Sequence, residues 1–371
     1  MFTGLGGMEM NRKLLKNIEY PILIAIILIT ILSVLIISSA THATSPEGSF
    51  RTARMQIVWF LAGLVAMLFM ISIDYHTFAH WANVIYVVNV ITLLLVIFTG
   101  EEGGGAQRWI DLGPFRLQPS EFAKLALAIT LAKHLEKKKS LNTLQDLITV
   151  FAHMAAPMLL IAKQPDLGTS LVLVAMTFGV MFIAGLSYKL LASIIATGIL
   201  SLPLLWKLLK PYQKDRILVF LNPYLDPLGK GYHVIQSKIA IGSGKLLGKG
   251  LYQGTQNQLD FLPVKHTDFI FAVLGEELGF IGGVILLGLY FMLLYYCLRV
   301  AFKARDLLGT YMVVGIVSMW AFQILINIGM NVGIMPVTGI PLPFMSYGGS
   351  SFIMNMMAAG LVLNVGMRRQ K

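Results

Sequence analysis

Apolar blocks separated by short polar connections recur along almost the whole chain. Each block is close to the length that a helix needs to cross about 30 Å of hydrocarbon. A membrane leaves few ways to satisfy backbone polar groups other than helices, so this pattern predicts an all-α polytopic membrane protein. We expect ten transmembrane helices, at residues 21–40, 55–73, 81–99, 118–135, 147–162, 167–185, 187–206, 279–298, 309–332 and 349–366.

One long polar stretch interrupts the pattern, at residues 207–267 between the seventh and eighth predicted helices. We expect a single integral membrane domain over residues 1–371, in which this stretch is a large outer loop with amphipathic helical segments. Residues 232–241 have the periodicity of such a segment, with Lys238 on its polar side. A loop this long usually carries function.

Composition and charge agree with a membrane protein. The 371 residues are 56% hydrophobic and only 13% charged, which leaves too few polar side chains to cover a soluble globule. With ten spans, most Lys and Arg residues outside the long loop fall on the side of the two termini, which predicts cytoplasmic termini. The basic residues of 207–267 then face outward, where they cannot meet cytosolic nucleic acid. Their partners there are membrane lipids, phosphates or another protein.

The weakest block for this topology is 147–162, which is short and contains Pro157. Without it, every later segment would change sides of the membrane. The single cysteine, Cys297, lies inside an apolar block and can build neither a disulfide nor a cysteine metal site. The histidines are scattered and show no metal-binding motif, and no nucleotide-binding loop is present.

Asp268 is the first candidate for chemistry, because it stands where the polar loop returns to apolar sequence. A partly desolvated carboxylate at a membrane surface keeps enough basicity to act as a general base. Thr267 or Asp268 directly before an apolar run is also a common helix N-cap. From the residues alone, the cap is the favoured interpretation.

Further candidates lie in the fourth predicted helix and directly before it. Glu121 and Lys124 are three residues apart and share a helix face, so they form either a functional intramembrane pair or a purely structural one. Arg108 lies in the outer loop before this helix, beside Trp109. It suits a diphosphate or the headgroup of a membrane lipid.

Asp166 lies in a tight hairpin between the fifth and sixth predicted helices, at the same outer face. An N-cap on the sixth helix is the favoured interpretation, and a role at the site is the alternative. Lys238 and Lys249 supply positive charge in the outer loop. Both are candidates for binding a phosphate group.

Several motifs together resemble the SEDS family of bacterial cell-wall proteins. The resemblance covers nearly the whole chain and is closer to the rod-shape members than to the division members. Lys245 is a departure, since a glycine is more usual there. The matching stretches are Gln107-Arg-Trp-Ile-Asp-Leu-Gly113, Gln118-Pro-Ser-Glu121, Gln164-Pro-Asp-Leu-Gly-Thr-Ser170, Tyr232-His-Val-Ile-Gln-Ser-Lys-Ile-Ala-Ile-Gly-Ser-Gly244, Gly248-Lys-Gly250, Phe261-Leu-Pro263, His266-Thr-Asp-Phe-Ile-Phe271, Gly275-Glu-Glu-Leu-Gly279 and Ser346-Tyr-Gly-Gly-Ser350.

The resemblance implies a ten-helix peptidoglycan glycosyltransferase of the bacterial cytoplasmic membrane that polymerises lipid II, an undecaprenyl-diphosphate-linked disaccharide peptide, at the outer face. It implies a class B penicillin-binding protein, a transpeptidase, as partner. By motif, Asp268 matches the essential aspartate of the family, Glu121 and Lys124 match its buried pair, and Asp166 matches its Gln-Pro-Asp position. These correspondences favour Asp268 as the catalytic residue.

The expected reaction is an inverting transfer with Asp268 as general base and positive groups around the departing diphosphate. Arg108, Lys238, Lys249 and Arg216 are the available cations, and a divalent cation, Mg²⁺ or Mn²⁺, held by Asp166 or Asp268 is a further candidate. No metal site is assigned from the sequence. Two alternatives are a transporter of lipid-linked precursor and a non-enzymatic scaffold for the transpeptidase. Against transport, the chain shows no internal repeat and its polar residues gather at one face.

Overall fold

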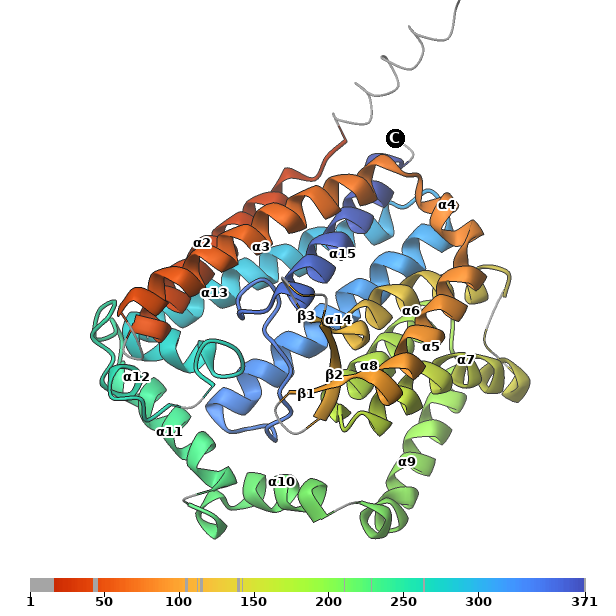
Figure 1. Ribbon diagram of the computed structural model, residues 1–371. Helices are drawn as coiled ribbons and strands as arrows, with labels where there is room; N and C mark the ends of the chain where they lie inside the picture. The colour runs from red at the N-terminus through yellow and green to blue at the C-terminus, as the bar shows by residue number, and fades with distance from the viewer. Residues whose placement is uncertain are drawn as a thin grey trace, which may run out of the picture.

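A bundle of long helices makes up most of the computed structural model (Figure 1). It describes residues 17–42, 46–103, 106–111, 113, 116–138, 141, 143–209, 211–227, 229–262 and 264–369. Among these, seven helices are long and apolar enough to cross a membrane. They are α2 (Tyr20–His42), α3 (Pro46–Ser72), α5 (Ala82–Thr99), α7 (Leu144–Lys163), α13 (Ile270–Phe302), α14 (Leu307–Val332) and α15 (Gly349–Met367).

The other three predicted blocks are helical as well, but they are shorter or more polar. Helix α8 (Leu167–Ile183) and the apolar part of α9 (Tyr188–Leu208) are short. Helix α6 (Pro119–Glu136) carries several charged side chains. The structure therefore shows a polytopic helical membrane protein, whereas the count of ten spans stays a prediction. The uncertain block around Pro157 is one continuous helix, α7.

All the long elements are helices, as expected for an all-α protein, and a small sheet is present in addition. A three-stranded antiparallel sheet occupies the connection between α5 and α6, with the strand order β1-β2-β3. Its strands are β1 (Glu101–Gly103), β2 (Ala106–Asp111) and β3 (Arg116–Leu117). This hairpin holds Arg108 and Trp109 at the end of the bundle where α6 begins.

The long polar stretch is mainly helical and runs around the outside of the bundle (Figure 1). The segment expected to be an amphipathic helix lies in α11, where Val234, Ser237 and Ala240 are buried and Lys238 is exposed. The elements after α9 are α10 (Pro211–Leu221), the 3-10 helix η1 (Pro223–Leu225), α11 (Lys230–Ser243) and the short α12 (Thr255–Gln258). A short helix, α4 (Tyr75–His80), joins α3 to α5.

Helix α13 starts earlier than predicted, at Ile270, and is kinked at Gly279. There φ is +64°, a left-handed conformation that glycine adopts readily. A Cβ at Gly279 would lie 2.3 Å from the backbone nitrogen of Gly248, so the two chain segments also need glycine for their close approach. The predicted start of this span therefore coincides with the kink rather than with the helix end.

The kink ties the outer loop to the bundle through backbone hydrogen bonds. The amides of Lys249 and Gly250 donate to the carbonyls of Glu276 and Glu277, each at 3.0 Å. In return, Phe280 donates to the carbonyl of Lys245 at 2.9 Å. Two glycine-rich motifs far apart in sequence thus form one joint beside the start of α13.

Candidate active site around Asp268

The carboxylate of Asp268 is not used to cap a helix. Helix α13 has Phe269 as its N-cap, and no side chain makes a capping hydrogen bond there. The expectation that Thr267 or Asp268 caps this helix is therefore wrong, because the chain turns through residues 264–269 before the first helical residue, Ile270. Asp268 is half-buried, and its side chain stays available for chemistry.

The backbone around Asp268 is held at three successive carbonyls. Tyr347 N–H donates to His266 O at 3.0 Å, and Ser346 Oγ donates to Thr267 O at 2.6 Å. The carbonyl of Asp268 accepts from Asn327 Nδ2 at 3.1 Å and from Asn331 Nδ2 at 3.0 Å. Both asparagines are fully buried in α14. The carboxylate is therefore carried on a fixed stretch of backbone.

Burial raises the pKa of Asp268 to about 6. A hydrogen bond from Thr267 and the positive charges of Arg216 and Arg108 oppose this effect, and the negative charge of Asp166 adds to it. The pKa is therefore raised but stays below neutrality, so the group is mostly ionised at pH 7 and still basic enough to accept a proton. Arg108, Arg216 and Asp166 therefore all lie close enough for their charges to act on the carboxylate of Asp268.

The loop at 338–340 lies between the two aspartates of this site. A Cβ at Gly339 would lie 3.5 Å from Asp268 Oδ2. On the other side, a Cβ at Gly168 in the first turn of α8 would lie 2.8 Å from Ile340 Cγ1. Asn327 Nδ2 also donates to Ile340 O at 2.8 Å, so the loop and Asp268 share an anchor.

Asp166 is the N-cap of α8, as favoured from the sequence. Its carboxylate accepts from Thr169 N at 3.1 Å and from Thr169 Oγ1 at 3.0 Å. Gln118 Nε2 and Ser120 Oγ lie 3.4 Å from the second oxygen, which connects the cap to the start of α6. With this many donors, Asp166 acts mainly on the local structure and the local potential.

Arg108 holds the hairpin that carries Asp166. Its Nε donates to Gln164 O at 2.9 Å, and its Nη2 donates to Pro165 O. Because two of its donors are used in this way, the guanidinium is fixed beside the hairpin. Its charge still reaches Asp268. Arg216, from α10, is the second cation of the site and is half-buried.

Glu121 and Lys124 form an ion pair inside α6, with Lys124 Nζ 2.9 Å from Glu121 Oε2. Their side chains are 2% and 0% exposed, so neither meets solvent. The pair lies directly after Ser120, which contacts Asp166. A role in binding substrate stays a prediction for both residues, since the structure places them beside the site but buried against each other.

Lys238 and Lys249 lie on the loop side of α13 and α14. Lys238 of α11 passes over the end of α14, where its Nζ would be 2.6 Å from a Cβ on Gly333. Lys249 Nζ binds Glu276 Oε1 at 2.8 Å and Thr255 Oγ1 at 2.7 Å. Glu276 is completely buried and also accepts from the amides of Gln256 and Asn257. In this structure Lys249 therefore has a structural partner.

A polar pocket of about 820 Å³ reaches the two residues that precede Asp268. His266 and Thr267 form part of its wall, and Trp59, Trp109 and Tyr347 supply aromatic rings. Burial and the neighbouring Lys265 lower the pKa of His266, which keeps its ring neutral at neutral pH. Aromatic faces with polar neighbours suit a saccharide, because sugar rings stack on aromatic rings and their hydroxyl groups need hydrogen-bond partners.

An apolar groove of about 450 Å³ lies between α3, α5 and α6. Its wall includes Phe69, Phe122, Leu125 and Met357, and at one end Ile110 and Leu117 of the small sheet. The groove therefore starts beside the hairpin that carries Arg108. Its walls are almost entirely hydrocarbon, which suits an extended lipid chain.

Several site residues could not be found from their own sequence signals. Asn327 and Asn331 lie inside an apolar block, where their spacing of four residues was the one available indication that they share a helix face. Ser346, Tyr347 and His266 occur in motifs, but only the fold brings them together. As for a metal, no group of three or more His, Cys, Asp or Glu side chains gathers among the described residues. A divalent cation at Asp166 or Asp268 stays a prediction.

Comparison with known proteins identifies the family. A family described as "Cell cycle protein", that of FtsW, RodA and SpoVE, matches residues 19–371. The peptidoglycan glycosyltransferase MrdB of Escherichia coli (strain K12) is 43% identical over 309 residues, covering 83% of this chain and 84% of its own. Stage V sporulation protein E of Bacillus subtilis (strain 168) is 41% identical over 353 residues, covering 93% and 95% of the two chains.

Solved structures show the same fold. A chain from a structure on the coordination of polymerization and crosslinking by a peptidoglycan synthase complex has a TM-score of 0.81 and 35% identity, covering 95% of this chain and 99% of its own. The rod shape determining protein RodA of Thermus thermophilus has a TM-score of 0.71 and 29% identity, covering 95% and 98% of the two chains. The chain therefore belongs to the SEDS family of peptidoglycan glycosyltransferases.

Proposed function

We propose that this protein polymerises lipid II into glycan strands at the outer face of the cytoplasmic membrane during cell elongation, with Asp268 as the general base. The observation that carries the proposal is the state of Asp268. Its carboxylate is free of capping, its backbone is held at three carbonyls, and burial raises its pKa to about 6. A carboxylate in this state is suited to take a proton from an alcohol in the transition state.

The reaction is a single displacement between two lipid-linked molecules. The 4-hydroxyl oxygen of one saccharide attacks the anomeric carbon of the other and forms the new glycosidic bond. The bond from that carbon to the diphosphate oxygen breaks, and both of its electrons leave with the lipid-linked diphosphate. Asp268 takes the hydroxyl proton. One displacement inverts the configuration at the anomeric carbon.

The departing diphosphate gains negative charge and needs cations that are already in place. Arg216 and Arg108 are the two whose charges act on Asp268, so they lie on the correct side of the site. Arg108 is fixed by two carbonyls, which lowers the cost of holding it near an anion. Lys238 is exposed on α11 and is a further candidate for binding phosphate, whereas Lys249 is better explained by its bond to Glu276.

Each part of a lipid-linked saccharide has a matching surface. The pocket of Trp59, Trp109 and Tyr347 adjoins His266 and Thr267, directly before the catalytic residue, and suits a sugar. The groove between α3, α5 and α6 suits the hydrocarbon chain of the carrier. Between these two surfaces lies the hairpin of Arg108. This arrangement favours an enzyme over a transporter, because the polar residues meet at one end of the bundle rather than at its middle.

A transpeptidase is the partner that we propose. The similar chain in the peptidoglycan synthase complex belongs to an assembly that couples polymerization to crosslinking. By analogy, a class B penicillin-binding protein would bind this chain and crosslink its product. The termini would then be cytoplasmic, and the Asp268 end of the bundle would face outward.

The test uses the purified protein with its transpeptidase partner in detergent, supplied with lipid II, and compares the parent with Asp268→Asn. We expect glycan polymer from the parent and at least a 100-fold lower rate from the variant, the usual range for loss of a general base being about 10²- to 10⁴-fold. Asp260→Asn is the matched control, since Asp260 is an exposed aspartate of the same loop, paired with Lys265.

Polymer from both the parent and Asp268→Asn would remove this residue from the chemistry. No polymer from the parent, combined with normal binding of the partner, would favour the scaffold. Transfer of lipid II across vesicle membranes by the Asp268→Asn variant would favour the transporter. Parallel reactions with EDTA, Mg²⁺ and Mn²⁺ test the need for a divalent cation.

A further inference from the structure

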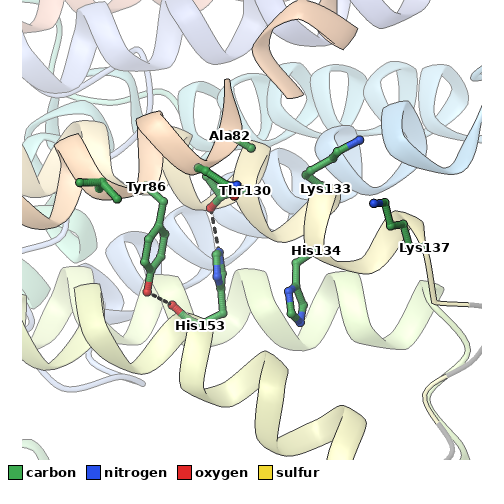
Figure 2. Close-up of a pocket in the computed structure, with 9 residues that line it drawn as sticks. Ala82, Tyr86, Thr130, Lys133, His134, Lys137 and His153 are labelled. Atoms are coloured by element: carbon green, nitrogen blue, oxygen red, sulfur yellow. Dashed lines mark hydrogen bonds between the residues drawn. The ribbon is translucent and has the colours of Figure 1, made fainter. Parts of the chain in front are cut away.

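A second polar pocket lies at the opposite end of α6 from Asp268. Its volume is about 460 Å³, and its wall comes from α5, α6 and α7 (Figure 2). Ser120, at the start of α6, contacts Asp166 of the active site, whereas Lys137 follows the end of this helix. At 1.5 Å per residue the two ends are about 25 Å apart, roughly the thickness of the hydrocarbon core. With the active site facing outward, this pocket faces the cytoplasm.

Three aromatic side chains from three helices form one wall of the pocket. Tyr86 of α5 stacks on His153 of α7, with ring centroids 4.3 Å apart, and His153 stacks on His134 of α6 at 5.4 Å. Hydrogen bonds fix this stack, from Tyr86 Oη to His153 O at 2.8 Å and between His153 Nε2 and Thr130 Oγ1 at 3.0 Å (Figure 2). The pocket wall is therefore rigid.

Two lysines at the end of α6 supply the charge. Lys133 and Lys137 both line the pocket. Lys133 Nζ binds Glu136 at 2.8 Å, which uses one of its three donors, and Lys137 is exposed. The nearby Lys138 is paired with Asp146 at 3.0 Å, so that carboxylate is neutralised. The charge left over at the mouth is positive.

One side of the pocket continues into the lipid-facing surface of α5. Val87 lines the pocket and is 53% exposed, and Ile91, one turn further along the same helix, is exposed as well. A ligand with an anionic group and a hydrocarbon chain can place its charge beside the lysines and its chain along this face. A soluble anion would leave the apolar face unused. Basic pockets between helices at the cytoplasmic surface are suited to phospholipid headgroups.

We infer that the pocket between α5, α6 and α7 binds the phosphate headgroup of an anionic phospholipid from the inner leaflet, with Lys133 and Lys137 as its cations. The site is separate from the active site, but α6 connects the two. A bound headgroup would hold the far end of the helix whose first turn contacts Asp166. The inference rests on the outward orientation of the proposed active site, but lipid binding itself can be measured without any polymerisation.

The test is native mass spectrometry of the full chain in detergent, titrated with phosphatidylglycerol or with phosphatidylethanolamine. We expect phosphatidylglycerol to bind more tightly. Lys137→Gln should weaken its binding about 5-fold, and Lys133→Gln with Lys137→Gln about 30-fold, since each cation near a membrane surface contributes a comparable factor. The matched control is Lys303→Gln, an exposed lysine at the same end of the bundle. It should bind as the parent does.

Asp268→Asn should also bind phosphatidylglycerol as the parent does, so loss of polymerisation and loss of lipid binding are separate outcomes. Thermal unfolding verifies that each variant is folded, and Lys137→Gln alone suffices if the double variant is not. Equal binding of phosphatidylethanolamine, or equal weakening by Lys303→Gln, would overturn the inference. Displacement of the lipid by millimolar inorganic phosphate alone would assign the pocket to a soluble anion instead.

Discussion

Asn331 donates a hydrogen bond from Nδ2 to the carbonyl of Asp268 at 3.0 Å, and its Oδ1 accepts from the amide of Ala272 at 3.2 Å. One buried side chain thus binds both the backbone before the start of α13 and an amide in the first turn of this helix. Asn327, one turn earlier in α14, adds a second bond to the same carbonyl. The position of the Asp268 carboxylate therefore depends on α14 rather than on α13 alone.

Asn331→Leu should lower the turnover number of the polymerase by about 10-fold or more while changing KM little. Leucine fills a similar volume but supplies none of the hydrogen bonds, and each bond contributes about 1 kcal/mol. The readout is the KM-against-kcat split in the lipid II assay. Asn331 is a positioning residue, so the pH profile of the residual activity should also shift.

The matched control is Asn364→Leu. Asn364 is equally buried and donates to the carbonyls of Met70 and Ile73, near the C-terminal end of α15 and far from Asp268. Both variants should lose thermal stability. An equal loss of activity in both would mean that general destabilisation, and not the position of Asp268, explains the effect.

The pH dependence of the reaction should report Asp268. A general base works only when it is deprotonated, and its pKa is about 6. We expect kcat/KM to rise about 10-fold per pH unit below 6 and to be flat above it. Initial rates between pH 4.5 and 8 measure this, with Asp260→Asn as the control that keeps the profile. A midpoint near the ordinary value for aspartate would contradict the role of burial.

Because of the same raised pKa, the stability of the fold should fall with rising pH, whereas the activity rises. The folded protein binds the proton of Asp268 more tightly than the unfolded chain does, so this group stabilises the fold at low pH. That contribution is lost as pH rises from about 4 to 6. At pH 7 Asp268→Asn should therefore be more stable than the parent, by up to about 3 kcal/mol in the free energy of unfolding, and should unfold at a higher temperature. At pH 4 the variant and the parent should be about equally stable.

The helices were predictable because a membrane imposes one length and one periodicity on the chain. Apolar blocks such as 309–332 and 349–366 match α14 and α15 closely. The start of α13 was not predictable in this way, because the segment before Gly279 is helical but carries the buried, polar Glu276 and Glu277. Their polarity made this segment resemble a loop, whereas in the fold the outer loop binds Glu276, and Asn257 and Ser39 of α2 bind Glu277.

The site was predictable only in part, for a similar reason. Motifs pointed to Asp268, Arg108 and Asp166, and the charges of Arg108 and Asp166 both act on Asp268. The asparagine anchors and the sugar-sized pocket depend on segments that are remote in sequence. The structural partner of Lys249 also required the fold, because Glu276 lies beyond a turn that no local pattern predicts.

The two arginines of the site should respond differently to replacement by lysine. Arg108 needs a planar fork to bind the carbonyls of Gln164 and Pro165, which an ammonium cannot reproduce. We expect Arg108→Lys to lose activity about 10-fold or more, nearly as much as Arg108→Ala, since bonds to charged groups contribute about 1.5 to 3 kcal/mol.

Arg216 acts on Asp268 through its charge, so Arg216→Lys should keep most of the activity. Arg216→Gln should lose activity and raise the pH midpoint of the reaction, because a positive charge that lowers the pKa of Asp268 is removed. Polymerisation rates of the four variants across pH test both arginines together. Equal losses in Arg108→Lys and Arg216→Lys would contradict the distinction.

Glu276→Gln and Lys249→Met should impair stability more than substrate binding. Glu276→Gln removes the charged partner of Lys249, which keeps its bond to Thr255, and weakens two backbone contacts of Glu276. A loss of about 3 kcal/mol is expected for Lys249→Met, because it leaves the fully buried carboxylate of Glu276 without its cation. The loss should be smaller for Glu276→Gln, because Lys249 is 26% exposed and can be hydrated. Thermal unfolding and KM for lipid II are measured together. A large rise in KM with an unchanged unfolding temperature would instead support a role for Lys249 in binding phosphate.

Lys245 offers the reverse experiment, a substitution that should stabilise the fold. Its φ is +50°, a left-handed conformation that costs an ordinary residue about 1 kcal/mol and costs glycine nothing. Lys245 is exposed, and its carbonyl accepts from Phe280 at the kink of α13. Lys245→Gly should therefore raise the unfolding temperature slightly and keep that bond, whereas Lys245→Ala should not. The two variants remove the same charge, so a gain in both would mean that charge repulsion in the basic loop, and not backbone strain, is what the substitution relieves.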